Sequence, residues 1–402
     1  MTIAKKLERQ KLKAMESKRE NESNGFKAEE YWLNKKGCPV ETVPIRKMTK
    51  KQLQRDLDAS MSLGNQYFGY NWIDFAGIRI QATPPIERFY GVSAFLSIYN
   101  PQVDGNGPYS AATIFLSNGR GQNVEEIQVG WIVHPSLNGD TRTHLYTKWT
   151  VDGYQKTGCY NTKCPGFIQL SRVIPIDYAF PRTSEIGSYY KEEVLLRLYQ
   201  TEYFDYHLTM PVMNEELGMW PYEVFDKLSA NAGDLVQYGG KVYTPGGQYI
   251  TPTMGNGQFR GGHWLLTSYM RKVLYEIDVD GHKQQVSPDE SKVEPRESRC
   301  FYQGNHYNAN DGYWDYNFLF GGAGGGDQSE FCHYHRLKIN LGNADNMIDD
   351  LADIMSCKVE KFPTIYWYSC SVVIVSDEGA PIDLDMAAKT MNIPIERIYP
   401  KT

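Results

Sequence analysis

The amino-acid sequence predicts an all-β protein. Three stretches, which begin near Val92, Ile127 and Leu145, alternate between strongly apolar and other residues with a period of two. This is the pattern of a strand with one buried face. The 402 residues include 29 Tyr, 36 Gly and 20 Pro, a composition that favours strands and turns. Periodicity alone does not distinguish a sandwich from a barrel, so it leaves the arrangement of the strands open.

The clearest strand pattern begins at Glu125 and continues to residue 171. One face of the first strand carries Ile127, Val129, Trp131 and Val133, and the other carries Glu126, Gln128, Gly130 and Ile132. Glu125 falls on the face opposite Gln128. The sequence Asn138-Gly139-Asp140 tolerates positive φ and predicts a turn into a second strand at 145–151. A third strand is predicted at 166–171.

The first 36 residues form a polar, charged arm. Residues 1–20 carry seven Lys/Arg and three Glu and have no apolar segment of the kind found in a signal peptide. We expect a solvated, frayed helix there rather than an arm that binds a membrane or a nucleic acid. The net charge of -6 argues against nucleic acid as the main partner. No apolar run reaches the roughly 18 residues of a membrane span, so no membrane partner is expected.

The remaining elements follow in chain order. Residues 37–60 begin as an extended segment, and Thr49 is expected to cap a short helix that ends before Ser60. Pro221 is expected to open a helix that carries Phe225 and Leu228 on one side. Further strands are predicted at residues 91–99, 111–116, 172–180, 238–242, 268–278, 298–302 and 313–320, and a linker at 61–82.

Several sequence words resemble the neprosin family, plant proteins that include a secreted peptidase that cleaves after proline. The central words are GWIVHPSLNGDTR (130–142), YTKWTVDGY (146–154) and TGCYNTKCPGF (157–167). Others keep the family's order: CPVETVPIR (38–46), YGVSAFLSIYNPQV (90–103), GMWPYEVFDKL (218–228), GGKV (239–242), TMGNGQF (253–259) and SRCF with its following glycines (298–325). The resemblance covers roughly residues 37–334.

The resemblance implies an architecture and a location. It implies a two-sheet antiparallel β-sandwich as catalytic domain (83–334), preceded by a pro-segment (37–60). It also implies the disulfides Cys159–Cys164 and Cys300–Cys332, although reduced thiols remain the alternative in a cytosol. The family is secreted and this chain shows no signal peptide, so either the protein is cytosolic or the signal exon is missing from the sequence.

The resemblance also implies two glutamates that share acid and base work on a peptide bond. Gln128 stands where the first is expected, three residues before Trp131, and Lys241 stands where the second is expected, in GGKV. An amide cannot accept or hold a proton at neutral pH, although its N–H can donate to an oxyanion. Fungal glutamic peptidases pair a Gln with a Glu, so Lys241 is the decisive substitution. Lysine normally has a pKa near 10.4 and acts as a base only if burial lowers that pKa.

Three other features bear on the chemistry. Glu126 lies two residues from Gln128 on the same strand face, about 6.6 Å along the strand, and is a substitute carboxylate or a solvated one. Asp140 and Arg142 are expected to brace the hairpin connection as an internal pair. The aromatic residues of this stretch are expected to be mostly core, with a minority lining a cleft: Trp131, Tyr146, Trp149, Tyr154 and Tyr160.

No metal or other cofactor is expected, because the Cys-His-X-His run at 332–335 has no second pair at ligand spacing. Residues 335–402 are foreign to the family. Within them, 341–367 resembles part of a plant retroelement reverse transcriptase, and we interpret the tail as a fused fragment or a gene-model error.

Three functional hypotheses follow. The first is a pseudopeptidase that binds extended peptides or proteins, with proline-rich ligands as candidates. The second is an active proline-directed endopeptidase that uses Glu126 or Lys241. The third is a non-functional gene product, to which the absent signal peptide and the foreign tail point.

Overall fold

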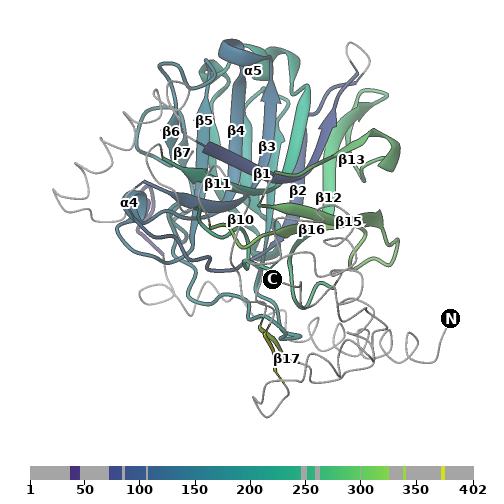
Figure 1. Cartoon of the computed structure of the whole chain (residues 1–402). Helices are drawn as coiled ribbons and strands as arrows, with labels where there is room; N and C mark the ends of the chain where they lie inside the picture. The colour runs from purple at the N-terminus through teal and green to yellow at the C-terminus, as the bar shows by residue number, and fades with distance from the viewer. Residues whose placement is uncertain are drawn as a thin grey trace.

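Two antiparallel β-sheets stacked face to face form the main body of the described residues (Figure 1). This computed structural model describes residues 37–45, 72–83, 87–105, 107–245, 251–258, 263–298, 300–325, 338–340 and 373–375. The predicted two-sheet antiparallel sandwich is confirmed, because neither sheet closes on itself. The arm at 1–36, the helix predicted after Thr49 and most of the tail lie outside the described residues.

The first sheet has seven strands in the order β14-β1-β11-β3-β4-β5-β6. Its strands are β1 (Trp72–Gln81), β3 (Tyr109–Asn118), β4 (Glu125–Val133), β5 (His144–Thr150), β6 (Cys159–Tyr160), β11 (Leu235–Thr244) and β14 (Val293–Arg296). The stretch that carries the central family words therefore supplies β4, β5 and β6 as neighbours at one side of this sheet.

The second sheet has nine strands, with the path β15-β16-β12-β2-β8-β9-β10-β7 and β13 beside β12. Its strands are β2 (Gly91–Ser97), β7 (Ile168–Gln169), β8 (Glu193–Gln200), β9 (Tyr206–Met210), β10 (Glu215–Trp220), β12 (Ser268–Val279), β13 (His282–Val286), β15 (Tyr302–Asn308) and β16 (Tyr316–Gly321). In the tail, β17 (Lys338–Asn340) and β18 (Val373–Val375) form a parallel pair.

Helices in the described residues are short. They are η2 (Gly121–Asn123), α4 (Pro135–Asn138), η3 (Pro211–Met213), η4 (Tyr222–Val224), α5 (Lys227–Asn231) and η5 (Glu290–Lys292). None of these is long and apolar enough to cross a membrane. Glu125, at the start of β4, accepts hydrogen bonds from the backbone N–H groups of Lys227 and Leu228, both at 2.8 Å, and so holds the first turn of α5 against the sheet.

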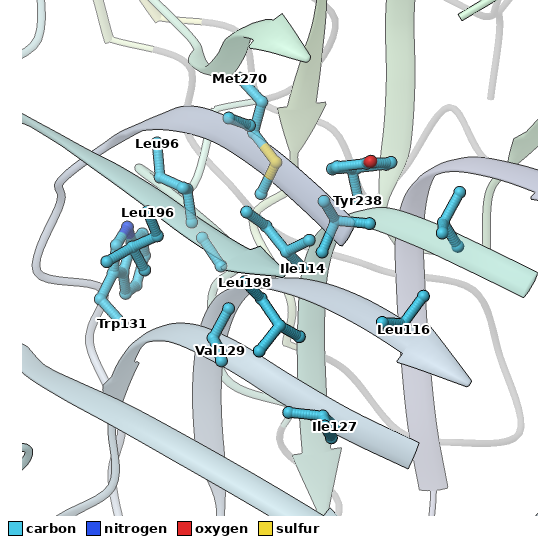
Figure 2. Close-up of a cluster of buried hydrophobic side chains, with 14 of the residues drawn as sticks. Leu96, Ile114, Leu116, Ile127, Val129, Trp131, Leu196, Leu198, Tyr238 and Met270 are labelled. Atoms are coloured by element: carbon cyan, nitrogen blue, oxygen red, sulfur yellow. The ribbon is translucent and has the colours of Figure 1, made fainter. Parts of the chain in front are cut away.

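The core lies between the two sheets and is built by the predicted alternation. Ile127, Val129 and Trp131 of β4 are fully buried, as expected for one face of that strand. In Figure 2 they meet side chains of the opposite sheet, among them Leu96, Leu196, Leu198 and Met270. The indole N–H of Trp131 donates to the carbonyl oxygen of Ser97 on β2 at 2.9 Å, so this buried polar group is satisfied across the sandwich.

The expected linker at 61–82 is wrong for its described part. Trp72–Gln81 form β1, which pairs with β11 on one side and β14 on the other. Ala76, Ile78 and Ile80 face the core, so the period of two is present in this segment. Both of its partner strands come from more than 150 residues later, which no local pattern indicates.

Four further predictions differ in detail. Residues 172–180 form no strand and are anchored by an isolated bridge between His144 and Ala179. The helix predicted from Pro221 is divided into η4 and α5. The strand predicted at 298–302 is a bridge from Ser298 to Phe301, and β15 begins only at Tyr302. The strand predicted at 166–171 shrinks to β7, which pairs with β10 in the other sheet.

Candidate active site

Gln128 and Lys241 lie side by side on the face of the seven-stranded sheet that turns away from the core. We call this the distal face, and in its centre it carries Glu126, Gln128, Tyr146, Lys148 and Lys241. Gln128 on β4 and Lys241 on β11 flank β3, where they pair with Phe115 and Ala111. The Lys241 ammonium donates to the Gln128 amide oxygen at 3.3 Å. The fold thus brings together the two positions, 113 residues apart in sequence, where the resemblance places glutamates.

Gln128 is buried and fully hydrogen-bonded. Its side chain is 1% exposed, and its amide nitrogen donates to Glu126 Oε1 and to the Tyr154 hydroxyl, the latter at 2.8 Å. The Tyr154 hydroxyl in turn donates to the same Glu126 oxygen at 2.8 Å. Since an amide nitrogen has two protons, both donors are already engaged. The oxyanion-donor role considered for Gln128 would therefore require one of these bonds to break.

Glu126 occupies the predicted position beside Gln128 and is neither fully solvated nor ion-paired within the described residues. It is partly buried and accepts from Gln128 and Tyr154 through one oxygen. Its carboxylate is thus the acceptor of a three-residue network on the distal face. Glu125, the neighbouring carboxylate, points to the other side of the strand, as predicted, and caps α5.

Lys148 also belongs to the site, although no sequence motif pointed to it. It lies on β5 directly opposite Gln128 and is 1% exposed. Its ammonium has no hydrogen-bond partner among the described residues, and it lies over the rings of Tyr154 at 4.3 Å and Tyr160 at 5.1 Å. The alternation of β5 contained the signal: a hairpin register that places Tyr146 opposite Gly130 also places Lys148 opposite Gln128.

Burial sets the electrostatics of the two lysines. It lowers the pKa of Lys148 well below its usual value, and the neighbouring Lys241 lowers it further, while Glu126 acts in the opposite direction. Burial also lowers the pKa of Lys241, with Glu126 again opposing the shift. Lys241 additionally lies over the Phe115 ring at 5.3 Å. The site therefore presents two desolvated amines and one engaged carboxylate instead of two carboxylates.

The aromatic residues divide between the two faces of the sheet. Trp131 and Trp149 belong to the inter-sheet core. Tyr146 and Tyr160 belong to a second apolar cluster on the distal face, which also contains Tyr109 and Tyr243. Burial raises the pKa of Tyr160 far above its usual value, so its hydroxyl stays neutral. Tyr154 contacts the site itself through Glu126 and Gln128.

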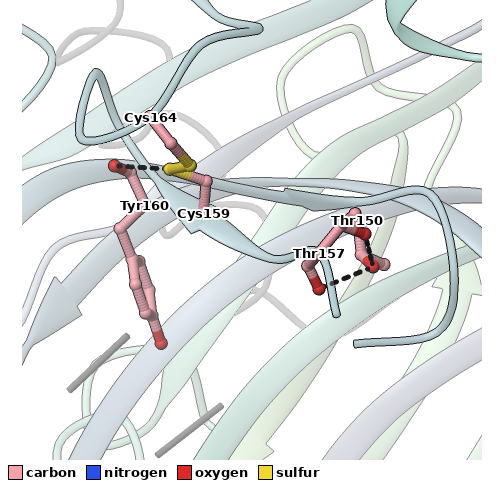
Figure 3. Close-up of a disulfide and its surroundings, with 5 residues drawn as sticks. All are labelled: Thr150, Thr157, Cys159, Tyr160 and Cys164. Atoms are coloured by element: carbon pink, nitrogen blue, oxygen red, sulfur yellow. Dashed lines mark hydrogen bonds between the residues drawn. A yellow bond between two sulfur atoms is a disulfide. The ribbon is translucent and has the colours of Figure 1, made fainter. Parts of the chain in front are cut away.

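The predicted disulfide between Cys159 and Cys164 is present, with Cα atoms 6.1 Å apart (Figure 3). It closes the turn after β6, which pairs with β5 through Cys159 and Tyr160. In Figure 3 the Tyr160 ring points away from the sulfur atoms. The disulfide thereby fixes the strand that carries Tyr160 beside Lys148. Cys332 lies outside the described residues, so the Cys300–Cys332 bond stays a prediction.

Asp140 and Arg142 form the predicted internal pair. The Arg142 guanidinium donates to Asp140 at 2.7 Å, and the ring of His144 lies 2.8 Å from the other carboxylate oxygen. Burial acts to raise the pKa of Asp140, but its hydrogen bonds to Arg142 and His144 prevail and lower it to about 2. The pair braces the connection between α4 and β5, which starts at Gly139 with φ of 76°.

Residues 37–45, the described part of the predicted pro-segment, bind at the edge of the nine-stranded sheet. The backbone N–H of Cys38 donates to the carbonyl oxygen of Arg172 at 2.9 Å, and the Arg172 guanidinium donates back to the carbonyl oxygen of Cys38. Further along, the Gln169 amide donates to the Pro44 carbonyl oxygen at 2.9 Å. Within the described ranges, no group of three or more His, Cys, Asp or Glu is placed to hold a metal ion.

Solved structures and a family profile match the chain. Two structures of scytalido-glutamic peptidase, each with a transition-state analogue, cover 62% of this chain and 98% of their own length at 10% identity, with TM-scores of 0.31 and 0.29. A peptidase of the eqolisin family in complex with the tripeptide Ala-Ile-His has the same coverage and identity and a TM-score of 0.30. The profile described as Neprosin matches residues 106–323, more than half of the chain. That match includes every strand of the distal-face site, and the chain therefore belongs to the neprosin family.

Proposed function

We propose that this protein is a pseudopeptidase that binds extended peptides, including proline-containing ones, and does not cleave them. The observation that supports this is the contact between Lys241 and Gln128 at 3.3 Å. A glutamic peptidase needs one carboxylate to activate water and a second carboxyl group to protonate the leaving amine. An amide paired with an amine supplies neither. Loss of one general acid or base typically costs about 10²–10⁴-fold in rate, and here both are replaced.

Restoring the carboxylates tests the proposal. The full chain and its Gln128→Glu/Lys241→Glu variant are compared on proline-containing peptides from acid to neutral pH. We expect no detectable cleavage by the parent and a gain of about 10²-fold or more over background in the variant. Lys148 would stand beside the new carboxylates and offset part of their charge.

A matched control keeps the same change in net charge. In Gln237→Glu/Lys156→Glu, Gln237 lies on β11 at a partly exposed position and Lys156 is exposed. This control should remain inactive. Cleavage by the parent would overturn the proposal. A double variant that folds, by circular dichroism, and stays inactive would show that the two substitutions are not what separates this chain from a peptidase.

An active endopeptidase is the second candidate, and the buried state of Lys241 favours it. Burial lowers the pKa of Lys241, which makes a neutral amine base more accessible than at the surface. Glu126, partly exposed and on the same face, is the other candidate base. If the parent is active, loss of cleavage in Glu126→Gln would assign the base to Glu126, and loss in Lys241→Met would assign it to Lys241.

A further inference from the structure

The centre of the distal face has unused hydrogen-bond donors. The Lys148 ammonium has three N–H groups and no hydrogen-bond partner in the described part of the chain, although the side chain is 1% exposed. Within the described residues, the Lys241 ammonium uses one of its three donors, on Gln128, and Lys241 is 7% exposed. When both amines are protonated, five N–H donors therefore have no acceptor among the described residues, and all five lie in a desolvated place beside the Gln128 amide. Buried donors normally have acceptors, so this arrangement calls for one.

Glu126, the carboxylate of the distal face, does not satisfy these donors. Glu126 accepts from Gln128 and Tyr154, and no hydrogen bond or ion pair connects it to either lysine among the described residues. When both amines are protonated, the group carries two positive charges and one negative charge. A second carboxylate would balance the charge and accept the free N–H groups. Glu126 is partly exposed, so a ligand would reach the lysines from its side of the sheet.

We propose that Lys148 and Lys241 bind a carboxylate group of the peptide ligand, so that this protein recognises acidic peptide groups where a peptidase would attack a neutral peptide bond. This rests on the peptide-binding role proposed above and specifies its ligand. Two amines held on either side of Gln128 suit the two oxygens of a carboxylate. The carboxylate belongs either to the C-terminus of the peptide or to an acidic side chain. No bond is made or broken.

Binding is coupled to protonation. Burial lowers the pKa of Lys148, and a bound carboxylate acts against that shift, so binding takes up a proton. Affinity is highest below the lowered pKa and falls as the pH rises above it. The charged and titratable groups that act on Lys148 or approach it are Lys241 from β11, Glu126 from β4, Tyr154, Tyr160 from β6 and His134 after β4.

Calorimetric titration of the full chain tests the proposal with four probes. They are acetyl-Ala-Ala-Pro-Ala-Ala as the free acid, the same peptide as the C-terminal amide, acetyl-Ala-Ala-Pro-Ala-Glu amide, and acetate alone. We expect the free acid or the Glu-containing amide to bind about tenfold or more tightly than the neutral amide, and the tighter of the two identifies the source of the carboxylate. Titrations in buffers of different ionisation enthalpy should show proton uptake at pH values above the lowered pKa of Lys148.

The variants assign the effect to the site. Lys148→Met and, independently, Lys241→Met should remove the preference for the acid, and the exposed Lys156→Met should keep it. Equal binding of the neutral amide and of both acidic peptides would overturn this inference and leave the peptide-binding proposal standing. Failure of all three peptides to bind would overturn both. A preference for the acidic peptides that survives both Lys148→Met and Lys241→Met would place the carboxylate elsewhere and overturn the inference. Tighter binding of acetate than of any peptide would overturn its peptide part.

Discussion

Lys148 shows how a single residue can lower the stability of the fold that contains it. Its amine is desolvated and lacks a hydrogen-bond acceptor among the described residues. Contacts with the faces of Tyr154 and Tyr160 offset part of the cost. The other buried side chains of β5 are mostly aromatic or β-branched. A buried lysine among them is typical of a functional position, where a residue that lowers stability is kept because it serves binding.

We expect Lys148→Met to raise the free energy of unfolding by about 1–3 kcal/mol at neutral pH, because methionine fills a similar volume without a polar group. The lowered pKa of Lys148 also determines whether the free energy of unfolding rises or falls with pH. The unfolded chain binds the proton up to the usual lysine pKa and the folded chain does not, so the free energy of unfolding of the parent rises with pH between those two values.

The same pH dependence should be weaker in Lys148→Met. Urea unfolding of both proteins at several pH values above neutral measures it, with Lys156→Met as the exposed control, expected to change stability by less than about 0.5 kcal/mol. A less stable Lys148→Met protein would mean that the amine makes favourable contacts that outweigh its desolvation.

At the scale of the elements, close pairing of β3 and β4 explains why the Gly-Trp motif begins with a glycine, Gly130. A Cβ atom on Gly130 would lie 2.0 Å from the carbonyl oxygen of Ala112 on β3. That oxygen belongs to the backbone of a central strand, so it cannot move away without disturbing the ladder. Gly130 thus allows β3 and β4 to pair closely beside Gln128.

We expect Gly130→Ala to destabilise the protein by about 1–3 kcal/mol or more, because the added methyl group could be accommodated only if the backbone of β3 or β4 moved. Gly304→Ala is the matched control: Gly304 is also a strand glycine, but the nearest atom to its added Cβ, on Leu319, is 3.7 Å away. The control should change stability by less than about 0.5 kcal/mol. Equal losses for both variants in thermal unfolding would contradict the close-approach explanation.

At the scale of the whole molecule, an apolar core fills the space between the two sheets, and two hydrogen bonds of buried aromatic side chains cross it. The Trp131 indole bond to Ser97 joins β4 of one sheet to β2 of the other. Tyr238 of β11 similarly donates to the carbonyl oxygen of Leu274 on β12 at 2.8 Å. These bonds fix how the sheet that carries the distal face sits on its partner.

We expect Trp131→Phe to reduce the free energy of unfolding by about 2–4 kcal/mol, since it leaves a cavity and removes the hydrogen bond to the carbonyl oxygen of Ser97. Trp149→Phe is the comparison, because the Trp149 indole N–H has no hydrogen-bond partner in the described residues and only packing is lost. Trp149→Phe should therefore lower the free energy of unfolding by about 1 kcal/mol less than Trp131→Phe does. Denaturant unfolding of the two variants measures the difference, and the opposite order would count against a stabilising inter-sheet bond.

The alternation of β4 was sufficient to place Gln128 and Glu126 on one face and Trp131 on the other. The family words were sufficient to predict the Cys159–Cys164 bond and to single out Gln128 and Lys241, which the fold brings into contact; that these residues replace two glutamates stays a prediction. The strand faces depend only on residues that are close in sequence, and the other features depend on short motifs that can be recognised whole. Three predictions failed in detail: the helix from Pro221, which is divided, the start of β15, and the strand at 172–180. Local propensity does not determine the structure of such short segments, because it depends on their packing.

The sequence by itself determined which side chains share a strand face, because that depends only on the period of two along the backbone. Tertiary structure decided which strands become neighbours. It placed β1 between β11 and β14, put Lys241 in contact with Gln128 across β3, and left Lys148 buried without an acceptor in the described chain. Strand pairing over more than one hundred residues depends on the competition among all strands for partners, and that information is not local to any segment.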